Sequence, residues 1–389
     1  MYDRRASEET NEGPKGLFPE IESSLPQQGG GDRNINSAAQ PVSREEAINE
    51  IVPELLNAAR REMAKRIVGQ EEMIEGLLTA LIAGGHILLE GVPGLAKTRA
   101  VKTLAEITGL VFKRIQFTPD LLPADLTGTL VWEQMSSSFS MRRGPVFANV
   151  ILADEINRAP AKVQSALLEA MEEKQVTIGE KSYPLPSPFF VLATQNPIEH
   201  EGTYALPEAE LDRFLLKLLI RYPVPEEELR ILMFSSPFNN GEAEKGSTLK
   251  TVLGPGELET IRKAADSVFA DDQIRKYIVS VVAASRPATS RSGPGERPKQ
   301  SPGIGPHKSR EGFYRYVAFG ASPRATLALY RCSKIKALLE GRSFVTPEDV
   351  KNAAFPVLRH RLVLSYEAEA DGLDPDTVIH RLLSLVPMP

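Results

Sequence analysis

A glycine-rich segment between an apolar run and a helix-like run constrains the fold of this chain more than any other feature. The segment follows the apolar residues 87–89 and consists of Gly91, Val92, Pro93, Gly94, Leu95, Ala96, Lys97 and Thr98. Where such a loop joins a strand to a helix, its backbone N–H groups can surround a phosphate, the lysine adds a positive charge and the threonine hydroxyl can bind Mg²⁺. The general pattern has glycine at the position of Ala96, and an ordinary Gly/Pro turn is the alternative. We predict a phosphate-binding loop.

Short apolar segments alternate with helical patterns from about residue 67 to residue 222. The expected strands span 86–90, 111–116, 149–154, 189–194 and 214–220. Val163, Leu167 and Met171 have helical spacing between the third and fourth of these strands. This alternation predicts a mostly parallel, five-stranded sheet with helices on both faces. Two interruptions, at 129–143 and 175–185, are predicted to be hairpins.

The remaining segments divide the chain into a tail, a core and a second domain. Residues 1–43 carry few large apolar groups, so we expect a disordered N-terminal tail. We assign 44–222 to an α/β core and 223–389 to a small helical domain. Residues 286–312 are rich in proline, glycine and basic residues, which predicts a flexible insertion. This insertion is either a tolerated surface loop or a contact for a regulator or an anionic partner.

Two smaller patterns concern individual helices. A helix is expected to begin after Ser43, with Ile48, Ile51, Leu55 and Leu56 on its apolar face. Thr346 followed by Pro347 predicts another helix start, with the threonine as N-cap.

Composition limits the class of partner and the compartment. A net charge of −5 at pH 7 argues against nucleic acid as the main partner. The single cysteine, Cys332, excludes an internal disulfide framework and a cysteine-based zinc site. No apolar run approaches the roughly 20 residues that cross a bilayer, and the N-terminus lacks the apolar stretch of a signal peptide. We therefore predict a cytoplasmic protein without a membrane span.

A strand that ends in two acids supplies the second part of the expected site. Asp154 and Glu155 follow the apolar residues 150–153, and ligands of open α/β sheets bind at the carboxyl ends of the strands. We expect Asp154 and Thr98 to hold Mg²⁺ and Glu155 to polarise the attacking water. Solvated acids or a helix cap are the alternative. Asn196, after the next strand, can hydrogen-bond the water or the γ-phosphate, although an Asn-Pro turn is its simpler explanation.

Two arginines complete the set of candidates. Arg213 lies between the apolar residues Leu211 and Phe214. Arg324 lies at the start of a predicted helix, where a cation opposes the helix dipole. Each is equally compatible with an ordinary surface charge.

Several of these segments together closely resemble the MoxR family of AAA+ ATPases. They are the segments 91–98, 116–123, 154–160, 193–197, 206–214 and 320–325. The resemblance covers about 45–389 apart from the insertion, and it accounts for Ala96, because alanine before the lysine is usual in that family. It implies that Lys97 and Thr98 contact the phosphates and the metal. It also implies that Asp154 and Glu155 form the Walker B pair.

The resemblance implies a role for each remaining candidate. Asn196 would be sensor 1, Arg324 would be sensor 2, and Arg213 would be a finger that reaches the ATP of a neighbouring subunit. Val68 and Gly69 would line the adenine. An arginine finger contributes about 10³–10⁵ in rate in comparable enzymes. The resemblance therefore implies a homo-oligomeric, hexameric ring with each site at a subunit interface.

The expected function is hydrolysis of ATP, with Mg²⁺, to remodel or mature a protein client. By resemblance the family is chaperone-like, related to metal-insertion motors, and commonly acts with a partner that carries a von Willebrand factor A (VWA) domain. A chelatase-type motor subunit and a nucleotide-gated scaffold with little turnover are the alternatives. The hairpin around Trp132 is expected either to face the pore or a partner, or to pack on its own domain.

Overall fold

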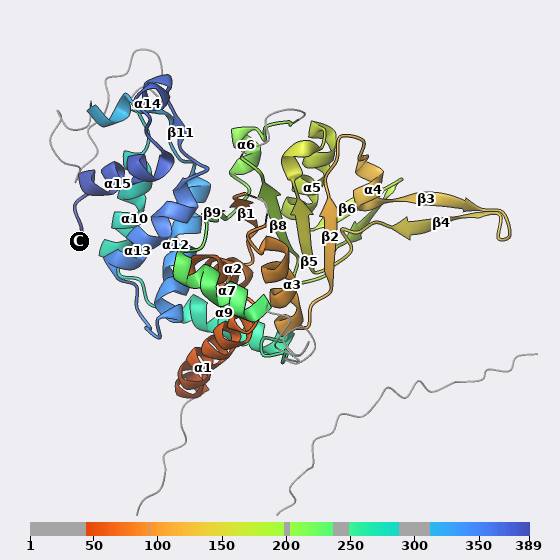
Figure 1. The fold of residues 1–389 in the computed structure, drawn as a ribbon, viewed down its shortest axis with the longest axis horizontal. Helices are drawn as coiled ribbons and strands as arrows, with labels where there is room; N and C mark the ends of the chain where they lie inside the picture. The colour runs from red at the N-terminus through yellow and green to blue at the C-terminus, as the bar shows by residue number, and fades with distance from the viewer. Residues whose placement is uncertain (1–43, 93, 198–202, 236–248, 288–311) are drawn as a thin grey trace, which may run out of the picture. The chain divides into compact units, whose positions relative to one another are not determined.

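The computed structural model describes residues 44–92, 94–197, 203–235, 249–287 and 312–389. The predicted tail at 1–43, the loop residue Pro93 and most of the predicted insertion at 286–312 lie outside the described residues. Figure 1 shows an α/β core, built around one sheet, and a group of helices formed by the C-terminal part of the chain.

Five short parallel strands form the sheet of the core. They are β1 (Ile87–Glu90), β2 (Phe112–Gln116), β5 (Val150–Asp154), β8 (Phe190–Gln195) and β9 (Leu216–Leu219), in the order β2-β5-β8-β1-β9. The predicted fold class is confirmed, and each strand begins and ends within two residues of its expected bounds. Because β5, β8 and β1 are neighbours, their carboxyl ends meet at one edge of the sheet.

Successive residues of the central strands enter two separate apolar clusters. Ile87 and Leu89 of β1 pack in a cluster with the helices α1 (Arg44–Ala64), α2 (Glu71–Ala83) and α3 (Lys97–Thr108). Leu88 packs on the opposite face, in a cluster with α5 (Ala161–Glu173). A strand points alternate side chains to opposite faces, so helices on both sides bury nearly every residue of these strands.

Helix α1 buries Leu56 and partly buries Leu55, as expected, but it does not bury Ile51. Its buried residues include Val52, Leu56 and Met63, whereas Ile51 is 51% exposed. The expectation for Ile51 was wrong, because the cluster lies on the side of the helix that Val52 shares with Leu56.

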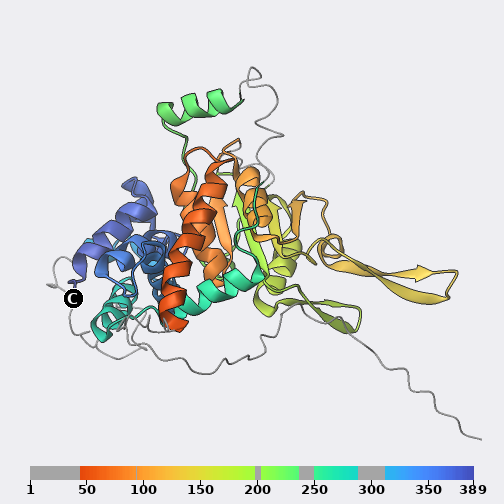
Figure 2. The same ribbon diagram turned by 90° about the horizontal axis from the view of Figure 1, so that it is seen from below.

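Both predicted hairpins are present, and they form two-stranded sheets of their own. The first pairs β3 (Gly128–Glu133) with β4 (Ser138–Arg143), after the short helix α4 (Pro123–Thr127). The second pairs β6 (Gln175–Ile178) with β7 (Lys181–Pro184). Figures 1 and 2 show the β3–β4 hairpin extending away from the five-stranded sheet. The short helix η1 (Ile156–Arg158) follows β5, and the short helix α6 (Glu208–Leu211) precedes β9.

The C-terminal part is a helical lid with one small antiparallel sheet. Its longer helices are α9 (Pro255–Ser267), α10 (Asp272–Ala284), α12 (Pro323–Leu339), α13 (Pro347–Leu358) and α15 (Pro375–Leu385). Helix α7 (Pro225–Ser235) connects the core to it, and α14 (Tyr366–Ala370), β10 (Val317–Phe319) and β11 (Val363–Leu364) complete it. Thr346 caps α13 as predicted, and Cys332 is buried. None of the helices in the described ranges is both long and apolar enough to cross a bilayer.

Candidate nucleotide site

The glycine-rich loop follows β1 and leads directly into α3. A Cβ atom at Gly91 would lie 2.8 Å from the carbonyl oxygen of Ile220, so a side chain does not fit there. Gly94 has a φ of +88°. Ala96, the N-cap of α3, has a φ of 56°, a conformation that costs a non-glycine residue roughly 1–2 kcal/mol. Backbone strain of this kind is found at functional sites, where the surrounding structure maintains it.

Lys97 is half-buried at the first turn of α3. Its Nζ donates a hydrogen bond of 2.6 Å to the carbonyl oxygen of Gly91. Burial lowers the pKa of Lys97, and the nearby charges of Asp154 and Glu155 oppose this shift. Ala96 has no side-chain oxygen with which to cap the helix. The N-terminus of α3 therefore offers uncapped N–H groups beside an ammonium group, an arrangement that suits a phosphate.

Asp154 ends β5 and is held by a donor on each side. Thr194 of β8 donates from its hydroxyl to Oδ1 at 2.6 Å. Arg114 of β2 donates to Oδ2 from Nε at 3.0 Å and from Nη2 at 2.6 Å. Neighbours on both flanking strands thus fix the carboxylate that we expected to hold the metal.

Glu155 has a left-handed backbone, with a φ of 57°. Its Oε2 accepts hydrogen bonds from Nε2 of Gln116 at 2.7 Å and from Nη1 of Arg158 at 3.1 Å. Its own N–H donates to the hydroxyl of Thr194 at 2.8 Å. One threonine therefore orients both acids, through the side chain of Asp154 and the backbone of Glu155.

Asn196 directly follows β8 and is buried. The backbone carbonyl oxygen of the residue before it, Gln195, accepts a hydrogen bond of 3.3 Å from the N–H of Gly91. This bond joins the end of β8 to the beginning of the loop. The structure therefore places the loop, the two acids and Asn196 at one edge of the sheet.

Arg213 and Arg324 come together at a different point. Arg213 precedes β9, and its Nε lies 3.2 Å from Oε2 of Glu172, near the end of α5. Arg324 is the second residue of α12, and its Nη2 is paired with Oε1 of the same glutamate. Two arginines from distant parts of the chain thus share one carboxylate.

Val68 and Gly69 form a turn before α2. Gly69 and the next residue, Gln70, both have positive φ angles, of 67° and 57°. Nε2 of Gln70 donates to the carbonyl oxygen of Arg221 at 3.0 Å. A Cβ at Gly69 would lie 2.4 Å from the carboxylate carbon of Glu227, so this turn packs against the first turn of α7.

Several residues of the site were missed by the sequence reasoning. They are Arg114, Gln116, Arg158, Glu172 and Thr194. Arg114 and Gln116 are two apart in β2, and this alternation was a visible signal for a shared face. The order of the strands was not visible, and it is the pairing of β2 with β5 that brings both residues to the acids.

The donor set suits magnesium bound together with a nucleotide. No group of three or more His, Cys, Asp or Glu side chains able to hold a metal occurs in the part of the chain that the structure describes. Mg²⁺ is commonly held by one or two protein oxygens, with water and substrate phosphates completing the shell. The carboxylate of Asp154 and the partly buried Thr98 after Lys97 fit that requirement.

Comparisons with known proteins agree with this geometry. Residues 86–216 match the ATPase family associated with various cellular activities (AAA), and residues 314–382 match the AAA lid domain. The chain is 47% identical to Chaperone MoxR1 of Mycobacterium tuberculosis over 334 residues, which cover 86% of this chain and 82% of that protein. It is 33% identical to Protein MoxR of Methylorubrum extorquens over 339 residues, covering 85% and 94%. A crystal structure from Cytophaga hutchinsonii matches with a TM-score of 0.77 and 43% identity, covering 88% of this chain and 98% of the other.

Proposed function

This chain belongs to the MoxR family of AAA ATPases, and from that premise we propose that it binds ATP with Mg²⁺ and hydrolyses it. The observation that carries the proposal is the meeting of the strained loop with Asp154 and Glu155 at one edge of the sheet. The alternatives were an ordinary turn for the loop and a helix cap for the two acids. Neither alternative requires both the uncapped start of α3 and two oriented acids beside Lys97.

Each residue of this site has a distinct task in the proposed reaction. Backbone N–H groups of the loop surround the phosphates, and the ammonium group of Lys97 pairs with the phosphate oxygens. The loop comprises Gly91, Val92, Pro93, Gly94, Leu95, Ala96, Lys97 and Thr98. Thr98 and Asp154 would hold Mg²⁺, which neutralises charge on the phosphates when bound. Glu155 accepts a proton from the attacking water, and Asn196 orients that water or the γ-phosphate. Val68 and Gly69 line the adenine.

A second part of the proposal concerns assembly. Arg324 would reach the nucleotide of its own subunit, and Arg213 would reach the nucleotide of the next subunit in a homo-oligomeric, hexameric ring. A cation that stabilises charge on the γ-phosphate is worth about 10³–10⁵ in rate in related reactions. Such a ring would remodel or mature a protein client together with a VWA-domain partner. The Mycobacterium tuberculosis relative is named a chaperone, which supports a chaperone-like role.

The test compares the wild-type protein with Glu155→Gln and Arg213→Ala. We expect both variants to bind ATP with Mg²⁺ and to release phosphate at least about a hundredfold more slowly, because a general base typically contributes about 10²–10⁴-fold and an arginine finger about 10³–10⁵-fold. Assembly is monitored by light scattering in the same samples. Failure of the wild-type protein to bind ATP would refute the proposal, and binding without turnover would make the protein a nucleotide-gated scaffold. Normal turnover by an assembled Arg213→Ala variant would refute the finger assignment.

A further inference from the structure

Glu172 lies where its charge does not benefit its own helix. It is the second-last residue of α5, and an acid near a helix C-terminus opposes the helix dipole. Arg324, near the N-terminus of α12, is equally unfavourable. The ion pair between them gives each charge a favourable partner. The positions of these two residues are therefore explained by their pairing and not by a contribution to the stability of either helix.

The shared carboxylate carries two cations at once. Oε2 of Glu172 faces Nε of Arg213 at 3.2 Å, and Oε1 is paired with Arg324. The two guanidinium groups repel each other, and together with one carboxylate they leave a net positive charge. If either arginine leaves, the other gains both oxygens and loses the repulsion, so that it becomes harder to withdraw.

The backbones that carry the two arginines are tied together independently of Glu172. The hydroxyl of Ser322, the N-cap of α12, donates to Oδ2 of Asp212 at 2.8 Å. Arg361 donates to the other oxygen of Asp212, also at 2.8 Å. The two arginine side chains can therefore leave Glu172 while the segments at 212 and 322 stay in place.

We propose that Glu172 is a positioning residue that couples the two arginines, so that a subunit whose Arg213 serves a neighbouring ATP binds its own ATP less tightly. This inference rests on the proposed function, in which Arg213 and Arg324 reach different nucleotides. When a neighbouring γ-phosphate draws Arg213 away, Glu172 holds Arg324 more strongly and keeps it from the nucleotide of its own subunit. Because coupling between binding sites is reciprocal, ATP that engages Arg324 equally restrains Arg213.

The test is a set of ATP and ADP titrations with Mg²⁺ on the assembled full-length chain. Every protein carries Glu155→Gln so that ATP is not consumed. The parent is compared with Arg213→Ala, Glu172→Gln and the double variant Arg213→Ala/Glu172→Gln. Glu173→Gln, an exposed acid next to Glu172 on the same helix, is the matched control. Glu172→Ala repeats the test without an amide that can hydrogen-bond to an arginine.

We expect Arg213→Ala to weaken ATP binding about two- to fivefold, the range that an exposed ion pair supports, because Arg324 then has Glu172 to itself. Adding Glu172→Gln should restore the affinity for ATP. ADP, which lacks the γ-phosphate, should bind all variants equally, and Glu173→Gln should match the parent.

Two results would overturn the inference while leaving the proposed function intact. One is a loss of ATP affinity in Arg213→Ala that persists in the double variant, as a direct contact alone would give. The other is an equal change in ATP and ADP affinity on Glu172→Gln, which would indicate a merely structural role. A parent protein that bound no ATP would instead overturn the proposed function and the inference together.

Discussion

Gly91 turns the chain out of β1 where the backbone of Ile220 leaves no room for a side chain. A Cβ there would meet the Ile220 carbonyl oxygen at 2.8 Å, so Gly91→Ala must displace either the loop or the end of β9. We expect the free energy of unfolding to fall by about 1–3 kcal/mol, as in other overpacked sites, and ATP binding to weaken. Urea denaturation and nucleotide titration measure the two effects. The control is Gly256→Ala in α9, where nothing lies within 4 Å of the added atom and stability should not fall.

His86 is a buried residue that makes stability depend on pH. The N–H of Val191 donates to its Nδ1 at 3.1 Å, so the proton of the neutral ring is on Nε2, which donates to the carbonyl oxygen of Met171 at 3.2 Å. Burial lowers the pKa of His86 from 6.5 to about 4. The unfolded chain therefore takes up a proton near pH 6.5, whereas the folded chain resists it until near pH 4.

This stabilisation is complete above about pH 6.5 and is lost as the pH falls towards 4, a change of about 3 kcal/mol. Denaturant midpoints between pH 7.5 and 4.5 should show the loss in the wild-type protein and a shallower slope in His86→Asn. Some slope should remain, because burial also lowers the pKa of His360. The exposed His380→Gln variant should keep the full slope, and an unchanged slope in His86→Asn would exclude His86 as its source.

At the scale of single residues, sequence reasoning identified the groups that have a local signature. Lys97 and Asp154 follow a strand or a loop with a recognisable pattern, and the structure brings them together. Arg114 and Glu172 have no such signature, because their partners lie on strands and helices far along the chain. Their importance arises from the order of the strands and from the approach of α12 to α5, which one sequence does not specify.

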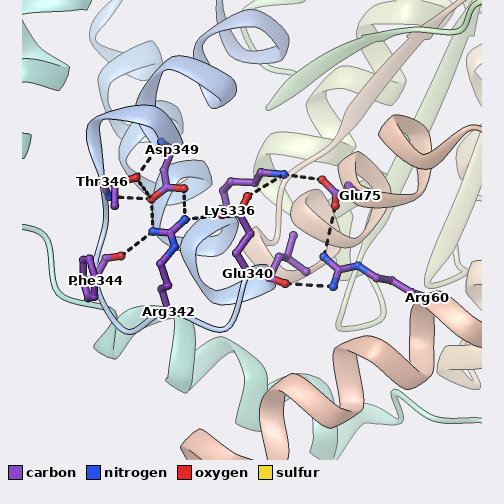
Figure 3. A network of polar contacts seen from close by, with 9 residues as sticks. Arg60, Glu75, Lys336, Glu340, Arg342, Phe344, Thr346 and Asp349 are labelled. Atoms are coloured by element: carbon purple, nitrogen blue, oxygen red, sulfur yellow. Dashed lines mark hydrogen bonds and ion pairs between the residues drawn. The ribbon is translucent and has the colours of Figure 1, made fainter. Parts of the chain in front are cut away.

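At the scale of elements, the start of α13 was predictable, but the network around it was not. Thr346 is the expected N-cap, because its hydroxyl accepts from the N–H of Asp349 at 3.4 Å; in addition, the N–H of Thr346 donates to Oδ2 of Asp349 at 2.7 Å. Figure 3 shows that Arg342 also donates to both oxygens of Asp349, at 2.6 and 2.7 Å. The same network continues through Glu340 and Lys336 to Glu75 of α2. A cap that was visible in the sequence is therefore part of a connection between the lid and the core.

This network predicts that two aspartates at helix starts, Asp349 of α13 and Asp374 before α15, contribute differently to the free energy of unfolding. Burial alone would raise the pKa of Asp349, but its bonds to Arg342 and Thr346 outweigh burial and lower it. Asp349→Ala leaves Arg342 without its buried partner and should cost about 3–5 kcal/mol. Asp374→Ala removes an ordinary cap of α15, the bond from Thr377 N–H at 2.8 Å, and should cost about 1 kcal/mol. Chemical denaturation measures both losses, and equal losses would show that Arg342 adds nothing.

The first hairpin illustrates a limit of prediction at the same scale. Its two strands were predicted as runs on either side of a turn at 135–138, but what the hairpin contacts was left open. Trp132 and Phe139 are 51% and 65% exposed, and their rings meet edge to face at 5.0 Å within the hairpin. This exposure favours a role in contacting the pore or a partner, which is still a prediction, over packing on the core.

At the scale of the whole described chain, Arg361 joins the lid to the segment that carries Arg213. It lies just after α13 and is almost completely buried. Its guanidinium group donates to the carboxylate of Asp212 and to the carbonyl oxygens of Phe214 and Leu215. The neighbouring His360 also bonds to the carbonyl oxygen of Phe214, at 2.9 Å. A single buried cation thus donates to a cluster of acceptors in the segment just before β9.

Arg361→Met keeps most of the volume of this side chain but removes its positive charge and its hydrogen bonds to Asp212 and to these carbonyl oxygens. Removing one partner of a buried pair typically costs about 3–5 kcal/mol, so we expect a loss of that size in urea denaturation. Arg361→Lys keeps the charge but not the planar fork, and it should recover only part of the loss. The control, Arg275→Met, removes an exposed arginine paired with Asp272 on α10 and should cost less than about 1 kcal/mol. Because Asp212 adjoins Arg213, Arg361→Met should also increase amide hydrogen exchange over residues 212–216. A loss of stability no larger than that of the control, with unchanged exchange, would show that the lid does not hold this segment in place.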